Sequence, residues 1–172
     1  MEQYKGQVRR VDELGRVVIP KEIRFTLKIN AGNMLEFFCD SNAKTLTLCK
    51  YEPIKAIKDF AHSCFAALQE YKEYGFLLCD STQVLFTQNL SPKEYVHSTM
   101  HYALFEKLRD NRVVQNATLF NKGDMQLKNV VLPINVDGDI WGCIVILGDN
   151  VPAYVISATR MICTIISNYI KQ

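Results

Sequence analysis

The chain has 172 residues, of which 48% are hydrophobic and 22% charged, and its formal net charge is +2. Such values are ordinary for a folded water-soluble chain of one or two domains. No apolar run approaches the ~20 residues that span a bilayer, and no apolar core follows the first residues, so they are not a secretory signal. These features exclude a membrane-spanning protein, and we expect a cytoplasmic location with no membrane partner.

Metal and redox sites are not indicated by the cysteines and histidines. Six cysteines occur without any C-x-x-C pair, which is atypical of zinc and dithiol sites and favours reduced, buried thiols. His97 and His101 have the spacing of one helical turn, but no glutamate stands in the H-E-x-x-H position and no third ligand is near. We therefore expect no metal site and no cofactor.

Positive charge is concentrated at the start of the chain. Residues 1–30 contain seven basic and four acidic residues, whereas residues 54–172 contain eleven of each. A local excess of this kind is typical of a surface that attracts a polyanion.

The pattern of residues 8–27 predicts strand, turn, strand and helix. Val8–Val11 and Arg16–Ile19 are rich in β-branched residues, and the turn between them ends at Gly15. Pro20 then ends the second strand and suits the start of a helix through Leu27.

Two further strands, at residues 34–39 and 45–49, complete a first domain over residues 1–52. A unit of about 50 residues buries little surface, and below ~70–80 residues a single core supplies only ~3–5 kcal/mol. Because no disulfide or metal is indicated, the sequence favours an intertwined homodimer.

The segment from Gly6 to Arg24 reads G-Q-V-R-R-V-D-E-L-G-R-V-V-I-P-K-E-I-R, and it resembles the AbrB-type transition-state regulators. The resemblance is strong over residues 4–52. It implies an interlaced swapped-hairpin dimer that binds double-stranded DNA through the arginines of the motif. By position these DNA-binding residues are Arg9, Arg10, Arg16 and Arg24.

One position departs from the family pattern. Relatives commonly have a second arginine after the helix arginine, and this chain has Phe25. Lys21 or Lys28 could take over the missing contact. No recognition helix of the helix-turn-helix kind is visible, so strands and loops are expected to read the DNA.

A second domain is expected over residues 53–172. Its pattern is a helix over residues 54–71, strands at 75–80 and 84–87, a helical region at 92–110, a loop at 121–124, a hairpin at 126–147 turning at Asp137-Gly138, and a last helix from about residue 152. This order resembles GAF domains, which are antiparallel sheets with flanking helices. The fold class of the whole chain is therefore α+β. The resemblance implies an effector pocket between the sheet and the variable loops, with no identifiable ligand residues. No nucleophile and base stand together, so we expect no enzyme.

The last helix indicates assembly. It has one narrow polar stripe, and most of its remaining circumference is apolar, so a partner helix should cover it. We expect a homotetramer built from two dimers, with a dimer as the alternative. The stripe consists of Ser157, Arg160, Thr164, Ser167 and Lys171.

The sequence thus favours a DNA-binding transcriptional regulator of sporulation and transition-state genes, whose second domain assembles and senses a small effector. The alternative is an antitoxin of the same fold, in which the C-terminal part binds a protein partner.

Overall fold

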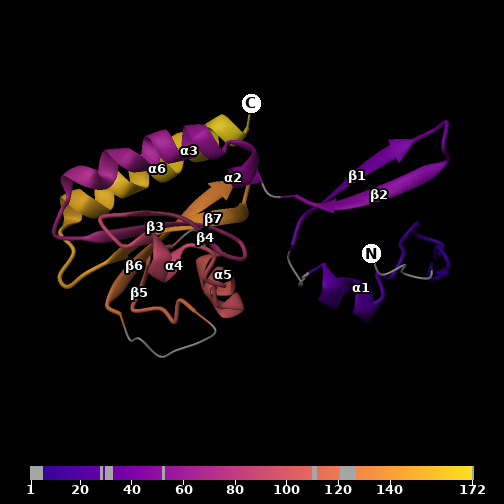
Figure 1. Cartoon of the computed structure of the whole chain (residues 1–172), viewed down its shortest axis with the longest axis horizontal. Helices are drawn as coiled ribbons and strands as arrows, with labels where there is room; N and C mark the ends of the chain where they lie inside the picture. Colours follow the sequence, from indigo (N-terminus) through magenta and orange to yellow (C-terminus); the bar gives the residue numbers. More distant parts are fainter. Residues whose placement is uncertain are drawn as a thin grey trace. The chain divides into compact units, whose positions relative to one another are not determined.

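The computed structural model describes residues 6–27, 29, 33–51, 53–109, 112–120 and 127–171. The chain divides into two compact units, Met1–Tyr51 and Glu52–Gln172 (Figure 1). Each unit is described by itself below. Within the described residues, no helix has the length and apolar character needed to cross a membrane.

Residues 6–20 form no strand in the single chain, so the prediction of two strands there is wrong at this level. A turn joins the two arms: the Asp12 amide donates to the Arg16 carbonyl at 3.0 Å, and the Gly15 amide donates to the Asp12 carbonyl at 3.0 Å. A strand needs a neighbour for its backbone N–H and C=O groups. Among the described residues, neither arm belongs to a sheet, and the valine side chains of the arms lie exposed.

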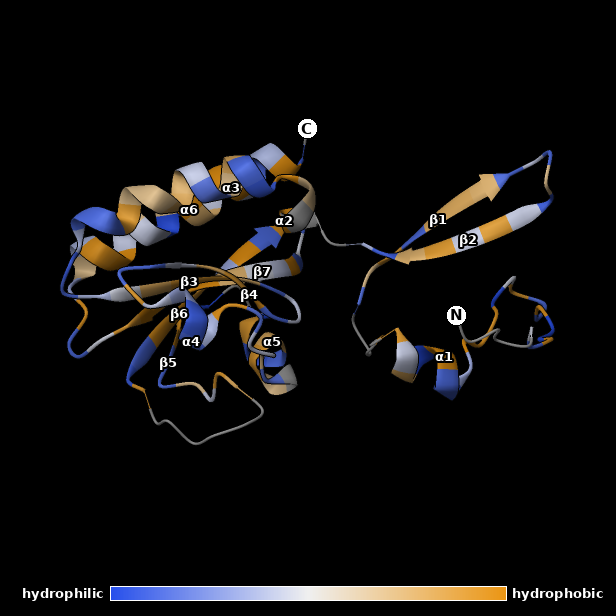
Figure 2. Cartoon of the chain, in the orientation of Figure 1, coloured by the Kyte–Doolittle hydropathy of each residue, from blue (hydrophilic) through white to orange (hydrophobic). Residues whose placement is uncertain are grey.

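The first unit continues with helix α1 (Lys21–Thr26) and the antiparallel hairpin β1 (Leu35–Asp40) and β2 (Thr45–Lys50). The two strands confirm the prediction for this segment. Asp40 fixes the turn, because its Oδ1 accepts the amides of Asn42 and Ala43 at 2.9 Å each. Strand β1 is mostly apolar and the turn polar (Figure 2).

Both faces of this hairpin carry exposed apolar side chains. Phe37 and Phe38 are neighbours in β1 and therefore point to opposite faces, yet they are 62% and 51% exposed. Helix α1 buries none of its residues. The first unit thus has no buried core of its own among the described residues except at Pro20.

The second unit is built on a five-stranded antiparallel sheet of order β4-β3-β7-β6-β5. Its strands are β3 (Gly75–Asp80), β4 (Val84–Gln88), β5 (Val114–Gln115), β6 (Asn129–Val136) and β7 (Asp139–Leu147). Its helices are α2 (Pro53–Ala56), α3 (Lys58–Ala66), the 3-10 helix η1 (Ala67–Glu70), α4 (Pro92–Tyr95), α5 (Tyr102–Leu108) and α6 (Ala153–Ile170). An antiparallel sheet with flanking helices is the architecture that the sequence predicts.

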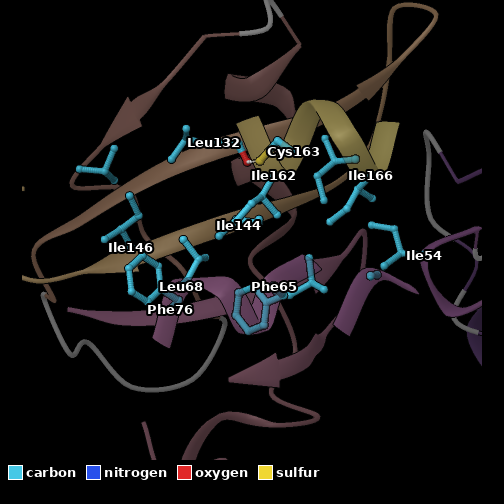
Figure 3. Close-up of a cluster of buried hydrophobic side chains, with 14 of the residues drawn as sticks. Ile54, Phe65, Leu68, Phe76, Leu132, Ile144, Ile146, Ile162, Cys163 and Ile166 are labelled. Atoms are coloured by element: carbon cyan, nitrogen blue, oxygen red, sulfur yellow. Dashed lines mark hydrogen bonds between the residues drawn. The ribbon is translucent and has the colours of Figure 1, made fainter. Parts of the chain in front are cut away.

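Alternate residues of the central strands face two different cores. In β3, Phe76 and Leu78 join the cluster under α3 and α6, which is drawn in Figure 3. Leu77 and Cys79 join the cluster under α4 and α5. This period of two explains why β3 is buried at every position. Helices therefore cover both faces of the sheet (Figure 1).

The predicted helix over 92–110 is wrong in its middle. The segment between α4 and α5 runs as a loop, with His97 at φ +70° and a bridge from Thr99 to Gln83. The Ser98 carbonyl accepts the Val84 amide at 3.1 Å, so this segment satisfies the edge of β4 in place of a helical turn. Asp110 and the predicted loop at 121–124 lie outside the described residues.

The remaining helix predictions agree better with the structure. The segment 54–71 is helical in three pieces (α2, α3 and η1), and α6 confirms the last helix. The β6–β7 turn has the positive φ of a two-residue hairpin, at Asp137 (+52°) and Gly138 (+95°).

Candidate nucleic-acid interface

The loop of residues 6–20 is organised by Asp12. Its Oδ1 accepts the amides of Leu14 at 3.0 Å and Arg16 at 2.8 Å, and its Oδ2 accepts Nε of Arg16 at 2.8 Å. One carboxylate therefore closes the turn and also orients the arginine that follows it. Gly15 takes φ +76° within the turn, a conformation that costs a side-chain-bearing residue energy.

The electrostatics of this pair keep Asp12 ionised. The backbone amide of Arg16, followed by its guanidinium, holds the pKa of Asp12 below its ordinary value. The Arg16 side chain nevertheless remains 72% exposed. Its Nε is engaged by Asp12, which leaves the terminal nitrogens directed away from this bond for another acceptor.

The other three arginines are also at the surface. Arg9 donates to the Val8 carbonyl at 3.1 Å and to Gln7 Oε1 at 3.3 Å, which are contacts within its own arm. Arg10 is exposed on the same arm, and Arg24 is exposed on α1. The structure thus groups Arg9, Arg10 and Arg16 on one loop and places Arg24 on the next element.

The role of the Asp12 side chain was not predicted from the turn pattern. The signal was present: an aspartate four residues before an arginine, with a glycine between them, is typical of a carboxylate that caps a turn. Phe25, at which the AbrB-type resemblance predicts arginine, is 85% exposed. Lys21 is exposed beside it on α1, whereas Lys28 lies outside the described residues.

His97 and His101, which have the spacing of metal ligands in the sequence, lie in a loop and at the N-cap of α5. His97 lies in the loop before α5, with Nδ1 3.4 Å from Gln83 Oε1, and His101 caps α5 by accepting the Ala103 amide at 3.3 Å. They do not share a helix turn. The described residues contain no group of three or more His, Cys, Asp or Glu side chains that could hold a metal ion.

The first part of the chain is similar to a known family of small regulatory domains. Residues 8–57 match the family model "Antidote-toxin recognition MazE, bacterial antitoxin". Over 48 residues, the chain is 52% identical to the transition state regulatory protein AbrB and 48% identical to the putative transition state regulator Abh, both of Bacillus subtilis (strain 168). Each match covers 28% of this chain, and 48% of AbrB and 50% of Abh. The first unit is therefore a domain of the MazE/AbrB type.

A longer similarity extends into the second unit. The chain is 36% identical over 152 residues to stage V sporulation protein T of Bacillus subtilis (strain 168), which covers 84% of each chain. The chain belongs to the family of stage V sporulation protein T. Among solved structures it is similar to the GAF domain of an Acinetobacter phosphoenolpyruvate-protein phosphotransferase, with 10% identity and a TM-score of 0.46, over 72% of this chain and 95% of that one.

Proposed function

We propose that this protein is a transcriptional regulator of sporulation and transition-state genes that binds double-stranded DNA through Arg9, Arg10, Arg16 and Arg24. The observation that carries the proposal is the exposed loop of residues 6–20, which holds three of these arginines around one fixed turn. Residues 8–20 of this segment lie within the region that matches the MazE family model, residues 8–57. Such a regulator acts in the cytoplasm.

The DNA-binding form is an intertwined dimer of the first domain, for which we propose the bounds 1–52. The support is the exposed apolar surface of the single unit, including Val8, Phe37 and Phe38, which a second copy would cover. The unpaired arms of residues 6–20 would then find their strand partners in the other chain. Four arginines per subunit become eight across the two-fold axis, enough to follow the groove of a duplex.

The second domain, for which we propose the bounds 53–172, assembles dimers into a tetramer. Helix α6 leaves an outer face exposed on which Met161 is 65% and Tyr154 62% exposed. The face extends to α3, because Tyr169 stacks on Phe60 with ring centroids 3.8 Å apart. Residues of this kind on two adjacent helices suit a bundle with the same helices of another dimer. Sedimentation of Met161→Glu should give a dimer where the wild type gives a tetramer, and a wild-type dimer mass at all concentrations would remove this part of the proposal.

Binding of DNA is tested by salt dependence. Arginine contacts with phosphate release counterions, and the slope of log K against log salt is about −0.9 per phosphate contact. Arg10→Ala removes one contact per subunit and therefore two per dimer, so its slope should be shallower by about 1.8. Promoter and random duplexes are compared, because phosphate contacts give affinity and base contacts give preference.

The matched control is Arg109→Ala, which removes an exposed arginine from the second unit. We expect the control to keep the wild-type slope. If both variants change the slope equally, the contact surface is not the loop of residues 6–20. Absence of binding by the wild type at low salt would contradict the proposed function directly.

An antitoxin role is the second candidate, because the matching family model describes toxin recognition by MazE. The second unit argues for regulation instead, since it folds around a five-stranded sheet and not as an extended wrapping segment. The two roles differ in a deletion strain. Loss of an antitoxin arrests growth through its free toxin, whereas loss of a sporulation regulator spares vegetative growth.

An effector would act through the second unit. The resemblance to GAF domains implies a pocket between the sheet and the variable loops. On the α4 and α5 side of the sheet, the described residues form the dense cluster around Leu77, Leu104 and Val145. Ligand binding to the folded state stabilises it by RT ln(1 + [L]/Kd). Thermal-shift measurements with metabolites therefore test the effector role.

A further inference from the structure

A cavity of about 220 Å³ lies between strand β6 and helix α6, on the opposite face of the sheet from α4 and α5. Its apolar wall includes Val113, Leu132 and Cys163. The Cys163 thiol faces the Leu132 carbonyl, with 3.9 Å between sulfur and oxygen (Figure 3). The cavity thus opens where the helix crosses the outer part of the sheet.

The polar stripe of α6 forms the other wall. Arg160, Thr164, Ser167 and Lys171 all border the cavity, together with Asn168. A stripe of this kind ordinarily faces bulk water, while the apolar face contacts the sheet. Here the stripe borders β6. Ser167 is only 7% exposed, whereas Arg160, Thr164 and Lys171 are exposed beside the cavity.

The charges at the cavity are positive. Among the described residues that line it, Arg160 and Lys171 are charged and none is acidic. The nearest ion pair joins Lys171 Nζ to Asp137 Oδ1 at 2.7 Å, and both of its side chains are substantially exposed, so the pair exchanges readily with water or with another anion. Arg160 can present its planar fork to an oxyanion, which a carboxylate matches with two parallel hydrogen bonds.

The hydroxyl groups of Thr164 and Ser167 favour a ligand that carries a hydrogen-bond donor. Ser167 donates to the Cys163 carbonyl at 2.8 Å, and Thr164 donates to the Arg160 carbonyl at 3.0 Å. Their hydrogens are therefore committed to the helix backbone, while their oxygens keep lone pairs that accept hydrogen bonds. A hydroxyl group of a ligand can therefore donate a hydrogen bond to either oxygen.

We propose that this cavity binds a small organic carboxylate that carries a hydroxyl group beside a short apolar chain. The carboxylate meets Arg160, the ligand hydroxyl donates to Thr164 or Ser167, and the short chain lies against Val113 and Leu132. The site deepens the proposed effector role by giving it a place and a ligand class. It rests on the proposed function only for its effect on DNA, since binding is measured without DNA.

The test uses the full chain and isothermal titration calorimetry. The probes are 2-hydroxyisovalerate, isovalerate, the methyl ester of 2-hydroxyisovalerate, and inorganic phosphate. We expect the hydroxy acid to bind best, isovalerate more weakly, and the uncharged ester not at all. Equal binding of acid and ester would exclude recognition of the carboxylate, and tighter binding of phosphate would exclude the ligand class.

Two variants locate the site. Arg160→Gln should weaken binding of the hydroxy acid about 10- to 100-fold, the range expected for loss of a charged hydrogen-bonding partner. Thr164→Phe fills the cavity without changing its charge and should abolish binding. Thr164 is exposed on α6, so this variant is expected to fold, and its unfolding midpoint checks that it does.

The matched control is Arg109→Gln, which removes the same charge from the end of α5. It should bind the hydroxy acid as the wild type does. Equal weakening in Arg109→Gln and Arg160→Gln would place the effect elsewhere, and no saturable binding of any probe by the wild type would overturn the proposal. A protein that binds the acid but not DNA would support the site and contradict only the proposed function.

Discussion

The buried side chain of Asn129 holds the segment after β5 against the start of β6. It is 3% exposed at the start of β6. Its Nδ2 donates to the Ala117 carbonyl at 2.9 Å and to the Leu127 carbonyl at 2.7 Å, and its Oδ1 accepts the Ala117 amide at 3.0 Å. One side chain thus ties the loop after β5 to the strand that follows it.

Replacing Asn129 by leucine removes all three hydrogen bonds and keeps the volume similar. The net loss, with two buried backbone groups of Ala117 left unpaired, is about 3 kcal/mol. For a unit of this size that loss lowers the unfolding midpoint by about 10 °C. The whole unit should respond, because β6 pairs with β7 along its full length.

The assay is thermal unfolding of the full chain followed by near-ultraviolet circular dichroism. The control is Asn168→Leu, the same substitution at an exposed position of α6. If Asn129→Leu shifts the midpoint no further than Asn168→Leu, the three hydrogen bonds do not stabilise the edge and the reasoning fails.

Three further predictions concern the turn and the thiols. Gly15→Ala should destabilise the turn by about 1 kcal/mol and weaken DNA binding, because an L-residue is disfavoured at φ +76°. No atom crowds the added Cβ, so the effect comes from the backbone conformation alone. Gel shifts measure the DNA affinity, with Arg109→Ala as the control. The contacts with Arg16 lower the pKa of Asp12, so the turn should stay ordered at and above the ordinary aspartate pKa and lose its order as the pH falls through the lowered pKa. The Gly15 amide resonance, followed against pH, measures the order of the turn. Asp12→Asn should remove this transition. Burial raises the pKa of the Cys79 and Cys163 thiols, so a thiol reagent should leave both unmodified until the protein unfolds; rapid labelling of either in the native protein would contradict the burial.

Local patterns predicted the elements whose partners are near in sequence. The β6–β7 hairpin follows from alternation around Asp137-Gly138, and α6 follows from its apolar periodicity after Pro152. The break between α4 and α5 could not be foreseen in this way. It depends on Thr99 pairing with Gln83 and on Met100 pairing with Phe120, which are tertiary contacts that override helix propensity.

The candidate sites likewise have parts that local sequence patterns predict and parts that only the structure reveals. The motif and the local charge excess predict the same four arginines, and their contacts with DNA stay a prediction. The orientation of Arg16 by Asp12 required the geometry of the turn. The cavity beside Arg160 also required the structure, because a polar stripe on a helix does not reveal which strand it faces.

The unpaired arms of residues 6–20 have a consequence for how the protein responds to its own abundance. If their strands form only with a second chain, folding of the DNA-binding unit and association are one equilibrium, and the stability of that unit is inseparable from concentration. At low expression the concentration of the proposed dimer then rises with the square of the number of chains. A modest increase in synthesis would therefore give a sharper increase in the species that we propose binds DNA.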